Sequence, residues 1–227
     1  MIRVTSHVSS EAQHMSKLDD ADLRRLARTV LVREAAGLDS LVDVVEPSVV
    51  RIARAAVSTT GKVITTGSGT SGIMAERLAH LLSVCGTPAL YLPSMDALHG
   101  GMGAVGTDDL VLAISKTGRS VESTQLVSGL VGRGIHVVAV TEAADSPFAA
   151  AATEIVELPT TAPGADPGDM IALTSTLAVG AWGDAVGVVA MALTGHTMRD
   201  VVDLHPAGGV GTREDVRTGD NAPVVAL

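Results

Sequence analysis

The chain has 227 residues, of which 46% are hydrophobic and 1% aromatic, and its formal net charge at pH 7 is −9. An acidic protein repels nucleic-acid phosphates, and the scarcity of aromatic rings removes the platforms on which single-stranded bases stack, so we expect no nucleic-acid partner. The hydrophobic content, together with 24 glycines and 9 prolines, excludes a chain that is disordered throughout and fits one folded domain.

Two features bear on the compartment in which the protein works. Residues 1–16 contain neither a long apolar run nor a small-residue cleavage pattern, so the sequence predicts no secretory signal peptide. The single cysteine, Cys85, cannot form an internal disulfide. We therefore expect a cytoplasmic protein.

The first part of the chain is expected to be helical. Residues 1–18 are polar and predict a flexible arm, and apolar residues then recur at helical spacing from Asp20 to Ile52. Pro47 is expected to break or kink this pattern, so the segment should form two helices or one bent helix.

Five short apolar runs follow, and helical patterns separate most of them. The runs cover residues 62–66, 89–92, 110–114, 135–140 and 154–158. Largely apolar strands that alternate with helices indicate a parallel sheet with both faces covered. We therefore predict an α/β fold, a doubly wound five-stranded parallel sheet of flavodoxin-like order 2-1-3-4-5, with the first helices as an N-terminal extension.

A long apolar segment runs from Met170 to Leu193, after a loop rich in Pro, Gly and Asp. The segment contains Asp184 and several hydroxyl and glycine residues, and no basic residues flank its start. We therefore expect a helix buried against other helices, with no membrane contact. The domain is predicted to cover residues 19–213, and residues 214–227 are predicted to form a C-terminal tail.

A glycine loop, Gly67–Gly72 with the sequence GSGTSG, follows the first strand and opens a helix. The loop matches the G-x-G-x-x-G pattern of dinucleotide-binding folds, which also need an acidic residue at the end of the second strand. Here the nearest acid, Asp96, lies beyond Pro93, and the loop carries three hydroxyls that a pyrophosphate turn does not need. NAD or a flavin is thus the weaker alternative, and we expect no cofactor and no metal.

A second loop, Ser115–Ser120 with the sequence SKTGRS, follows the third strand and opens another helix. Hydroxyls and backbone N–H groups at a helix N-terminus bind a compact anion. In the predicted strand order this loop and the glycine loop flank one crevice. We therefore predict a phosphate-monoester pocket, with ordinary Ser/Gly turns as the alternative. The candidate phosphate-binding residues are Ser68, Thr70, Ser71, Ser115, Lys116, Thr117, Gly118 and Ser120.

With these motifs the chain resembles the sugar isomerase (SIS) domain family, and within it the arabinose-5-phosphate isomerases. GSGTSG stands at the first glycine loop of that family, and SKTGRSVE stands at its sugar-phosphate loop. Two further segments match, LHGGMG at Leu98–Gly103 and LHPAGG at Leu204–Gly209. The resemblance extends over roughly residues 20–211.

The resemblance implies an aldose–ketose isomerase that acts on a phosphorylated sugar through an enediol. It implies phosphate contacts from Ser71, Ser115, Thr117 and Ser120. It also implies a homotetramer, a dimer of dimers whose active sites combine residues from more than one subunit, so that one of two histidine motifs serves a neighbouring chain. The candidate catalytic residues by this resemblance are Glu122, His99 and His205.

This chemistry needs a base that removes the proton beside the carbonyl and a second group that moves a hydroxyl proton. A carboxylate in a half-buried cleft and an imidazole with a pKa of about 6.5 both suit such work. Glu122 lies in the first turn of the helix after the phosphate loop, His99 precedes two glycines, and His205 precedes a proline. The alternatives are a surface glutamate, a turn histidine and a helix-capping histidine.

Several departures from the family pattern concern the site. The family lysine of the first loop is replaced by Thr70, and the nearest cations are Lys116 and Arg119. The family glutamate before the long helix has no aligned acid, and Asp166 is the nearest one. We also expect an isomerase core without the paired C-terminal CBS modules of many relatives. A non-catalytic phosphosugar-binding regulator and a 6-phospho-3-hexuloisomerase remain alternatives, although the two histidine motifs argue against the latter.

Overall fold

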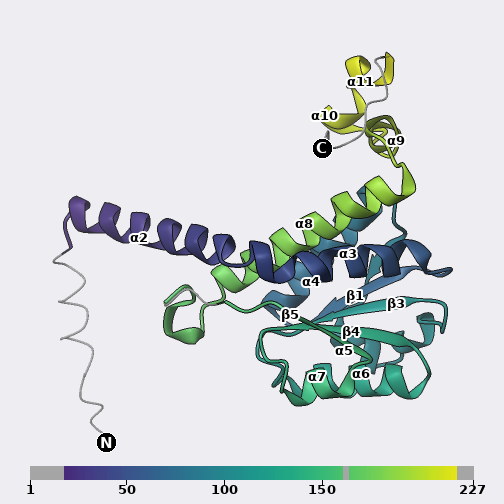
Figure 1. Cartoon of the computed structure of the whole chain (residues 1–227), viewed down its shortest axis with the longest axis horizontal. Helices are drawn as coiled ribbons and strands as arrows, with labels where there is room; N and C mark the ends of the chain where they lie inside the picture. The colour runs from purple at the N-terminus through teal and green to yellow at the C-terminus, as the bar shows by residue number, and fades with distance from the viewer. Residues whose placement is uncertain (1–17, 161–163, 219–227) are drawn as a thin grey trace, which may run out of the picture.

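The structure is a computed structural model that describes residues 18–160 and 164–218. Figure 1 shows a central sheet between two helical layers, and a long N-terminal helix that extends away from them. Most of the predicted arm and residues 219–227 of the predicted tail lie outside the described residues.

The sheet has the predicted parallel order β2-β1-β3-β4-β5. Its strands are β1 (Val63–Gly67), β2 (Ala89–Tyr91), β3 (Leu110–Ile114), β4 (His136–Thr141) and β5 (Glu154–Glu157). Every residue of β1 and β3 is buried, because helices cover both faces of these strands. This burial accounts for their apolar sequences, and the predicted fold class is confirmed.

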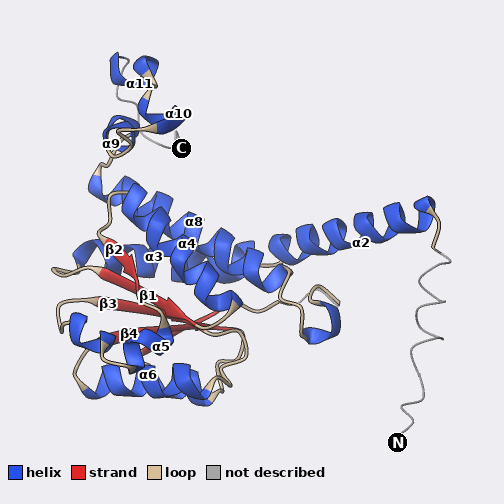
Figure 2. Ribbon diagram, turned by 180° about the vertical axis from the view of Figure 1, so that it is seen from behind, coloured by secondary structure: helices blue, strands red, loops and turns tan. Residues whose placement is uncertain are grey.

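Two helical layers cover the sheet (Figure 2). Because strand side chains alternate between faces, each layer has its own core: Leu112 packs into one and Val111 into the other. The layer that includes Leu112 contains α3 (Val42–Ser58), α4 (Thr70–Val84) and α8 (Thr174–Thr194). The opposite layer contains α5 (Ser94–Leu98), α6 (Val121–Gly132) and α7 (Pro147–Ala151).

The predicted N-terminal extension forms two helices, α2 (Asp20–Asp39) and α3. A capping box at Asp19 begins α2. The helices meet at residues 40–41, so the break predicted at Pro47 is wrong, and the proline lies inside α3. Pro47 is tolerated there because the carbonyl that it leaves unpaired belongs to Asp43, which is exposed and open to water.

The long apolar segment forms α8, which packs against α3 and α4. Trp182 is 1% exposed, and its indole N–H donates to Ser48 Oγ in α3 at 3.0 Å. Gly183 permits close approach to α4, because a Cβ there would lie 2.8 Å from Leu78 Cδ1. Among the described helices, α8 is the one long and apolar enough to span a membrane, with 44% of its apolar window buried. The predicted role as a packing helix agrees with these contacts.

Three short helices follow α8 and extend beyond its C-terminal end (Figure 1). They are α9 (Met198–Asp203), α10 (Gly208–Gly211) and α11 (Glu214–Thr218). The first five residues of the predicted tail therefore form a helix, α11. Arg217 pairs with Asp203 at 3.9 Å and ties α11 to α9.

An ion pair between Lys62 and the buried Asp109 closes the amino edge of the sheet. Asp109, whose side chain is 4% exposed, accepts the backbone N–H groups of Lys62 and Gly106 at 2.8 Å each and Lys62 Nζ at 2.9 Å. Burial raises the pKa of Asp109, but these hydrogen bonds and the lysine charge outweigh burial and lower it. The pair joins the starts of β1 and β3. Gly61 is required beside it, because a Cβ there would lie 2.4 Å from Asp109 Oδ1.

Candidate functional site

The glycine loop lies at the carboxyl end of β1 and leads into α4. Gly67 and Gly72 let the loop fold tightly, because a Cβ on Gly72 would lie 2.8 Å from the Gly67 carbonyl oxygen. Gly69 adopts a positive φ of 56° immediately before the first residue of α4. The tight turn places the hydroxyls of Ser68, Thr70 and Ser71 at the helix N-terminus.

The phosphate loop predicted at residues 115–120 lies at the carboxyl end of β3. Ser115 is buried, and its N–H donates to the Val140 carbonyl at 3.0 Å, which holds the loop beside β4. Gly118 has a φ of 59°, and a Cβ there would lie 2.0 Å from Ser146 Oγ. Ser120 caps α6 by accepting the Ser123 N–H at 3.1 Å. Thr117 is exposed at the tip of the loop.

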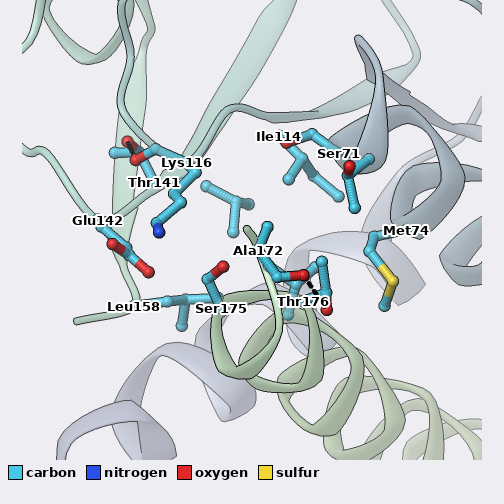
Figure 3. A pocket seen from close by; sticks show the side chains of 13 residues that line it. Ser71, Met74, Ile114, Lys116, Thr141, Glu142, Leu158, Ala172, Ser175 and Thr176 are labelled. Carbon is cyan, nitrogen blue, oxygen red and sulfur yellow. Dashed lines mark hydrogen bonds between the residues drawn. The ribbon is translucent and has the colours of Figure 1, made fainter. Parts of the chain in front are cut away.

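A pocket with a cavity volume of about 30 Å³ opens between these loops and the start of α8. Figure 3 shows its side chains converging from α4, the ends of β3 and β4, and α8. The polar groups that line it are Thr70, Ser71, Lys116, Thr141, Glu142, Ser175 and Thr176. Its apolar wall includes Met74, Ile114, Val140 and Leu158. The carboxyl ends of parallel strands are where ligands of open α/β sheets bind.

Lys116 is held in this pocket by Asp166, which follows β5 in sequence. The Lys116 ammonium donates to Asp166 Oδ2. Asp166 Oδ1 accepts the backbone N–H of Leu173 at 2.8 Å and of Ser175 at 3.3 Å. The Asp166 side chain is 3% exposed and that of Lys116 is 22% exposed. Burial raises the pKa of Asp166, but these hydrogen bonds outweigh burial and lower it. Asp166 thereby ties the phosphate loop to the N-terminus of α8.

Glu142 is a carboxyl group that lines the same pocket. It follows β4 directly, and its N–H donates to the Lys116 carbonyl at 3.0 Å. The Thr160 hydroxyl donates to Glu142 Oε1. Burial, the largest influence, raises the pKa of Glu142, and the negative charges of Asp166 and Asp169 raise it further against the lowering effect of Thr160 and Lys116. Glu142 therefore keeps its proton to a higher pH than a surface glutamate does.

Glu122 lies in the first turn of α6, directly after the phosphate loop, and it does not line the pocket that contains Glu142. Its own backbone N–H lowers the pKa of its carboxyl most, followed by the Ser120 and Ser68 hydroxyls. Ser68 belongs to the glycine loop, so Glu122 lies near both loops. Its environment favours the ionised form that a general base needs.

The two candidate catalytic histidines lie apart from the pocket in this chain. His99 is exposed and caps the end of α5. His205 follows α9, and its Nδ1 lies 2.6 Å from the Val201 carbonyl oxygen. The first turn of α8 lines the pocket, whereas His205 lies beyond the other end of this 21-residue helix, which is about 30 Å long. One chain therefore brings together Glu122 and the two loops but not His205.

Sequence reasoning missed Glu142 and the hydroxyls of Ser175 and Thr176. A signal for Glu142 was present, since it directly follows a strand whose carboxyl end faces the predicted crevice. No comparable signal identifies the start of α8, because residues that face a pocket and residues that face the core look alike in an apolar helix. Among the described residues, no three His, Cys, Asp or Glu side chains form a group that could hold a metal ion.

Comparison with protein families gives one match. Residues 57–180, more than half of the chain, match the SIS domain family. The chain is also 29% identical over 219 residues to arabinose 5-phosphate isomerase KdsD of Pseudomonas aeruginosa, a match that covers 94% of this chain and 67% of that protein. Further curated relatives named arabinose 5-phosphate isomerase GutQ are matched over 65% of their length. The chain thus spans about two thirds of the length of these relatives.

Two solved structures are also similar to this chain. A protein of Escherichia coli CFT073, solved in complex with arabinose 5-phosphate, superposes with a TM-score of 0.78 at 28% identity, covering 83% of this chain and 100% of the other. A candidate sugar-phosphate isomerase of Listeria monocytogenes superposes with a TM-score of 0.77 at 31% identity, covering 84% of this chain and 100% of the other.

Proposed function

This chain belongs to the SIS domain family, and we propose that it is a sugar-phosphate aldose–ketose isomerase whose reaction is that of the arabinose 5-phosphate isomerases. The observation that carries the proposal is the position of Glu122, a carboxylate with a lowered pKa in the first turn of α6, which is one of two neighbouring hydroxyl-rich helix N-termini. Such N-termini bind a phosphate group through N–H and hydroxyl donors. The sugar chain of the bound ester would then lie against a general base.

The reaction begins with an open-chain sugar phosphate. The Glu122 carboxylate removes the proton from the carbon beside the carbonyl, and the electron pair of that bond forms the double bond of an enediol as the carbonyl oxygen gains a proton. Glu122 then returns its proton to the former carbonyl carbon while the neighbouring hydroxyl loses its own. This sequence moves the carbonyl by one carbon without net oxidation, and a positioned base contributes about 10²- to 10⁴-fold to such a step.

The phosphate is proposed to bind the glycine loop and the phosphate loop. Ser71 and Lys116 line the pocket directly, and Ser120 stands at the N-terminus of α6. Thr70 has no charge, so Lys116 is the cation of the two loops that faces the pocket. Arg119, the other cation considered from the sequence, belongs to the same loop but does not line the pocket.

We further propose that the chain assembles as a dimer of dimers and that His99 or His205 of one subunit serves the site of another. Three observations support an assembly. α2 carries exposed apolar side chains, among them Leu23, Leu26 and Leu31. An apolar groove between α3 and α8 includes Val42 and Trp182. His205 cannot reach the pocket of its own chain across the length of α8.

The proposed compartment is the cytoplasm. Cys85 is a free, buried thiol, and burial raises its pKa above the ordinary value, so it stays a protonated packing residue. A free cysteine is usual in a reducing compartment.

The function is tested by incubating the full chain in D₂O with a panel of pentose, hexose and heptose phosphates and following the sugars by NMR. We expect interconversion of one aldose–ketose pair, with deuterium appearing on the carbon beside the carbonyl because an enediol exchanges that proton with solvent. Failure to convert any aldose or ketose phosphate would refute the isomerase proposal.

A thermal-shift series separates binding from turnover. We expect stabilisation by the phosphorylated sugar and none by its dephosphorylated form, since a ligand at 100 times its Kd stabilises the fold by about 2.7 kcal/mol. Stabilisation without turnover would instead favour a phosphosugar-binding regulator.

A further inference from the structure

Glu142 is placed to act on a ligand in the pocket. Its carboxyl lines the pocket together with Lys116 and Ser71, and Figure 3 shows the Glu142 carboxyl and the Lys116 ammonium projecting into the same space. The hydroxyl of Thr160 donates to Oε1, and the backbone N–H of Glu142 is fixed to the phosphate loop. The side chain is therefore held by both of its neighbouring loops.

The charged groups around Glu142 come from two elements. Lys116 belongs to the phosphate loop, and Asp166 and Asp169 belong to the connection between β5 and α8. Lys116 donates to Asp166, so its charge is shared and does not fully compensate Glu142. A carboxyl that is half-buried beside a shared cation keeps its proton to a higher pH than a surface carboxyl does.

The glycine loop lies near both Glu142 and Glu122. Ser68 helps to lower the pKa of Glu122, and Ser71, three residues later, lines the pocket with Glu142. A sugar phosphate that extends from this pocket toward α6 would meet two carboxyls with opposite pKa shifts. Such a pair divides into an acid and a base, each with its own role.

We propose that Glu142 is a further catalytic acid–base residue, which moves the proton between the two oxygens of the substrate while Glu122 moves the proton between the two carbons. This inference rests on the proposed isomerase function and deepens it. The Glu142 carboxylic acid donates its proton to the carbonyl oxygen as Glu122 removes the carbon-bound proton. The Glu142 carboxylate then accepts the proton of the neighbouring hydroxyl as Glu122 returns its proton to carbon. Both carboxyls end the cycle as they began it.

The test compares the wild-type chain, the variant Glu142→Gln and the control Glu157→Gln, which changes an exposed glutamate in β5. Gln keeps an oxygen that accepts the Thr160 hydrogen bond, so the fold should persist and melting temperatures should agree. We expect kcat of the Glu142 variant to fall about 100-fold, with KM within about threefold. The wild-type and control profiles should fall as pH rises through the raised pKa of Glu142, and this limb should be absent in the variant.

A second measurement uses a pentitol 5-phosphate, which lacks the carbonyl and cannot turn over. Calorimetric titration in two buffers of different ionisation enthalpy counts the protons taken up on binding. We expect uptake by the wild type and the control, and none by Glu142→Gln.

The outcomes separate the two proposals. If the wild type turns over a sugar phosphate and Glu142→Gln has the same kcat and pH profile, the catalytic role of Glu142 is overturned. The isomerase function is unaffected by that result. Binding of the pentitol phosphate without turnover of any sugar overturns the isomerase. In that case, proton uptake that the variant abolishes supports the contact of Glu142 with the ligand, and unchanged uptake overturns that as well.

Discussion

A Lys–Asp ion pair lies at each end of the parallel strands, which are called here the amino edge and the carboxyl edge of the sheet. The two pairs differ in their surroundings. At the amino edge, Lys62 pairs with the buried Asp109, and at the carboxyl edge, Lys116 pairs with the buried Asp166. Each aspartate also accepts two backbone N–H groups. In both, hydrogen bonds outweigh burial and lower the pKa of the aspartate.

What differs is the space beside each lysine. Asp109 closes a turn, where Gly61 has no room even for a Cβ. Lys116 lines a pocket together with Glu142 and the hydroxyls of the glycine loop. An ion pair is thus no evidence of function by itself; its location at the carboxyl or amino end of parallel strands decides its role. Changes at the carboxyl edge should alter activity, and changes at the amino edge should alter stability.

The largest effect is expected at the carboxyl edge. Glu122→Gln removes the proposed base, so kcat should fall about 10³-fold, which corresponds to about 4 kcal/mol in the barrier. Affinity for a sugar phosphate, measured by calorimetry, should stay within about threefold, because Gln keeps the shape of the side chain. A fall in affinity that matches the fall in kcat would mean that Glu122 binds the sugar and does not act as a base.

At the amino edge, Asp109→Asn should lower the free energy of unfolding by about 2 to 4 kcal/mol, because the buried carboxylate of Asp109, its pairing with Lys62 and its charge-assisted hydrogen bonds are lost. Urea unfolding measures this change. At a temperature where the variant is folded, its kcat should equal that of the wild type. Loss of activity in a fully folded Asp109 variant would contradict the division between the edges.

A matched pair of lysine variants sharpens the comparison. Lys116→Met should weaken binding of a sugar phosphate about tenfold or more, since a charge-assisted contact contributes about 1.5 to 3 kcal/mol. Lys62→Met should leave that affinity unchanged and lower stability by about 2 kcal/mol or more, because the buried Asp109 carboxylate loses its cation. Calorimetric titration of both variants with the same sugar phosphate provides the test, and equal affinities would remove Lys116 from the phosphate site.

The smallest expected effect is on the loss of stability at acid pH. Because the pKa values of Asp109 and Asp166 are lowered in the folded chain, their contribution to stability is complete above the unfolded value of about 3.9 and is lost as pH falls through the folded values. Unfolding free energies between pH 6 and pH 3 should therefore decline less in Asp109→Asn and in Asp166→Asn than in the wild type. Parallel curves for all three proteins would show that neither aspartate contributes to acid sensitivity.

The sequence was sufficient to predict the sheet, its order and the two loops, because these depend on local patterns. Apolar runs such as Leu110–Ile114 identify buried strands, and glycines with hydroxyls identify tight turns at helix N-termini. The far wall of the pocket was not predictable in this way. Lys116 and Asp166 lie 50 residues apart in sequence, and their contact depends on how the connection after β5 folds back.

The helix boundary at Ser40 and the role of α8 illustrate the same limit. Pro47 disfavours the interior of a helix. It is tolerated inside α3 because Asp43, whose carbonyl loses its hydrogen-bond partner, lies on the exposed preceding turn. The apolar sequence of α8 predicts burial, yet it does not distinguish Trp182 in the core from Ser175 and Thr176 at the pocket. Which face of such a helix meets a ligand is set by the packing partners.

Trp182 makes this protein convenient for spectroscopy. It is the only tryptophan of the chain, it is buried between α3 and α8, and its indole N–H is bonded to Ser48. Its emission therefore reports the separation of these two helices and should shift to longer wavelength when water reaches the ring. Because Trp182 does not line the pocket, one fluorescence trace can follow global unfolding while a ligand is titrated into the site.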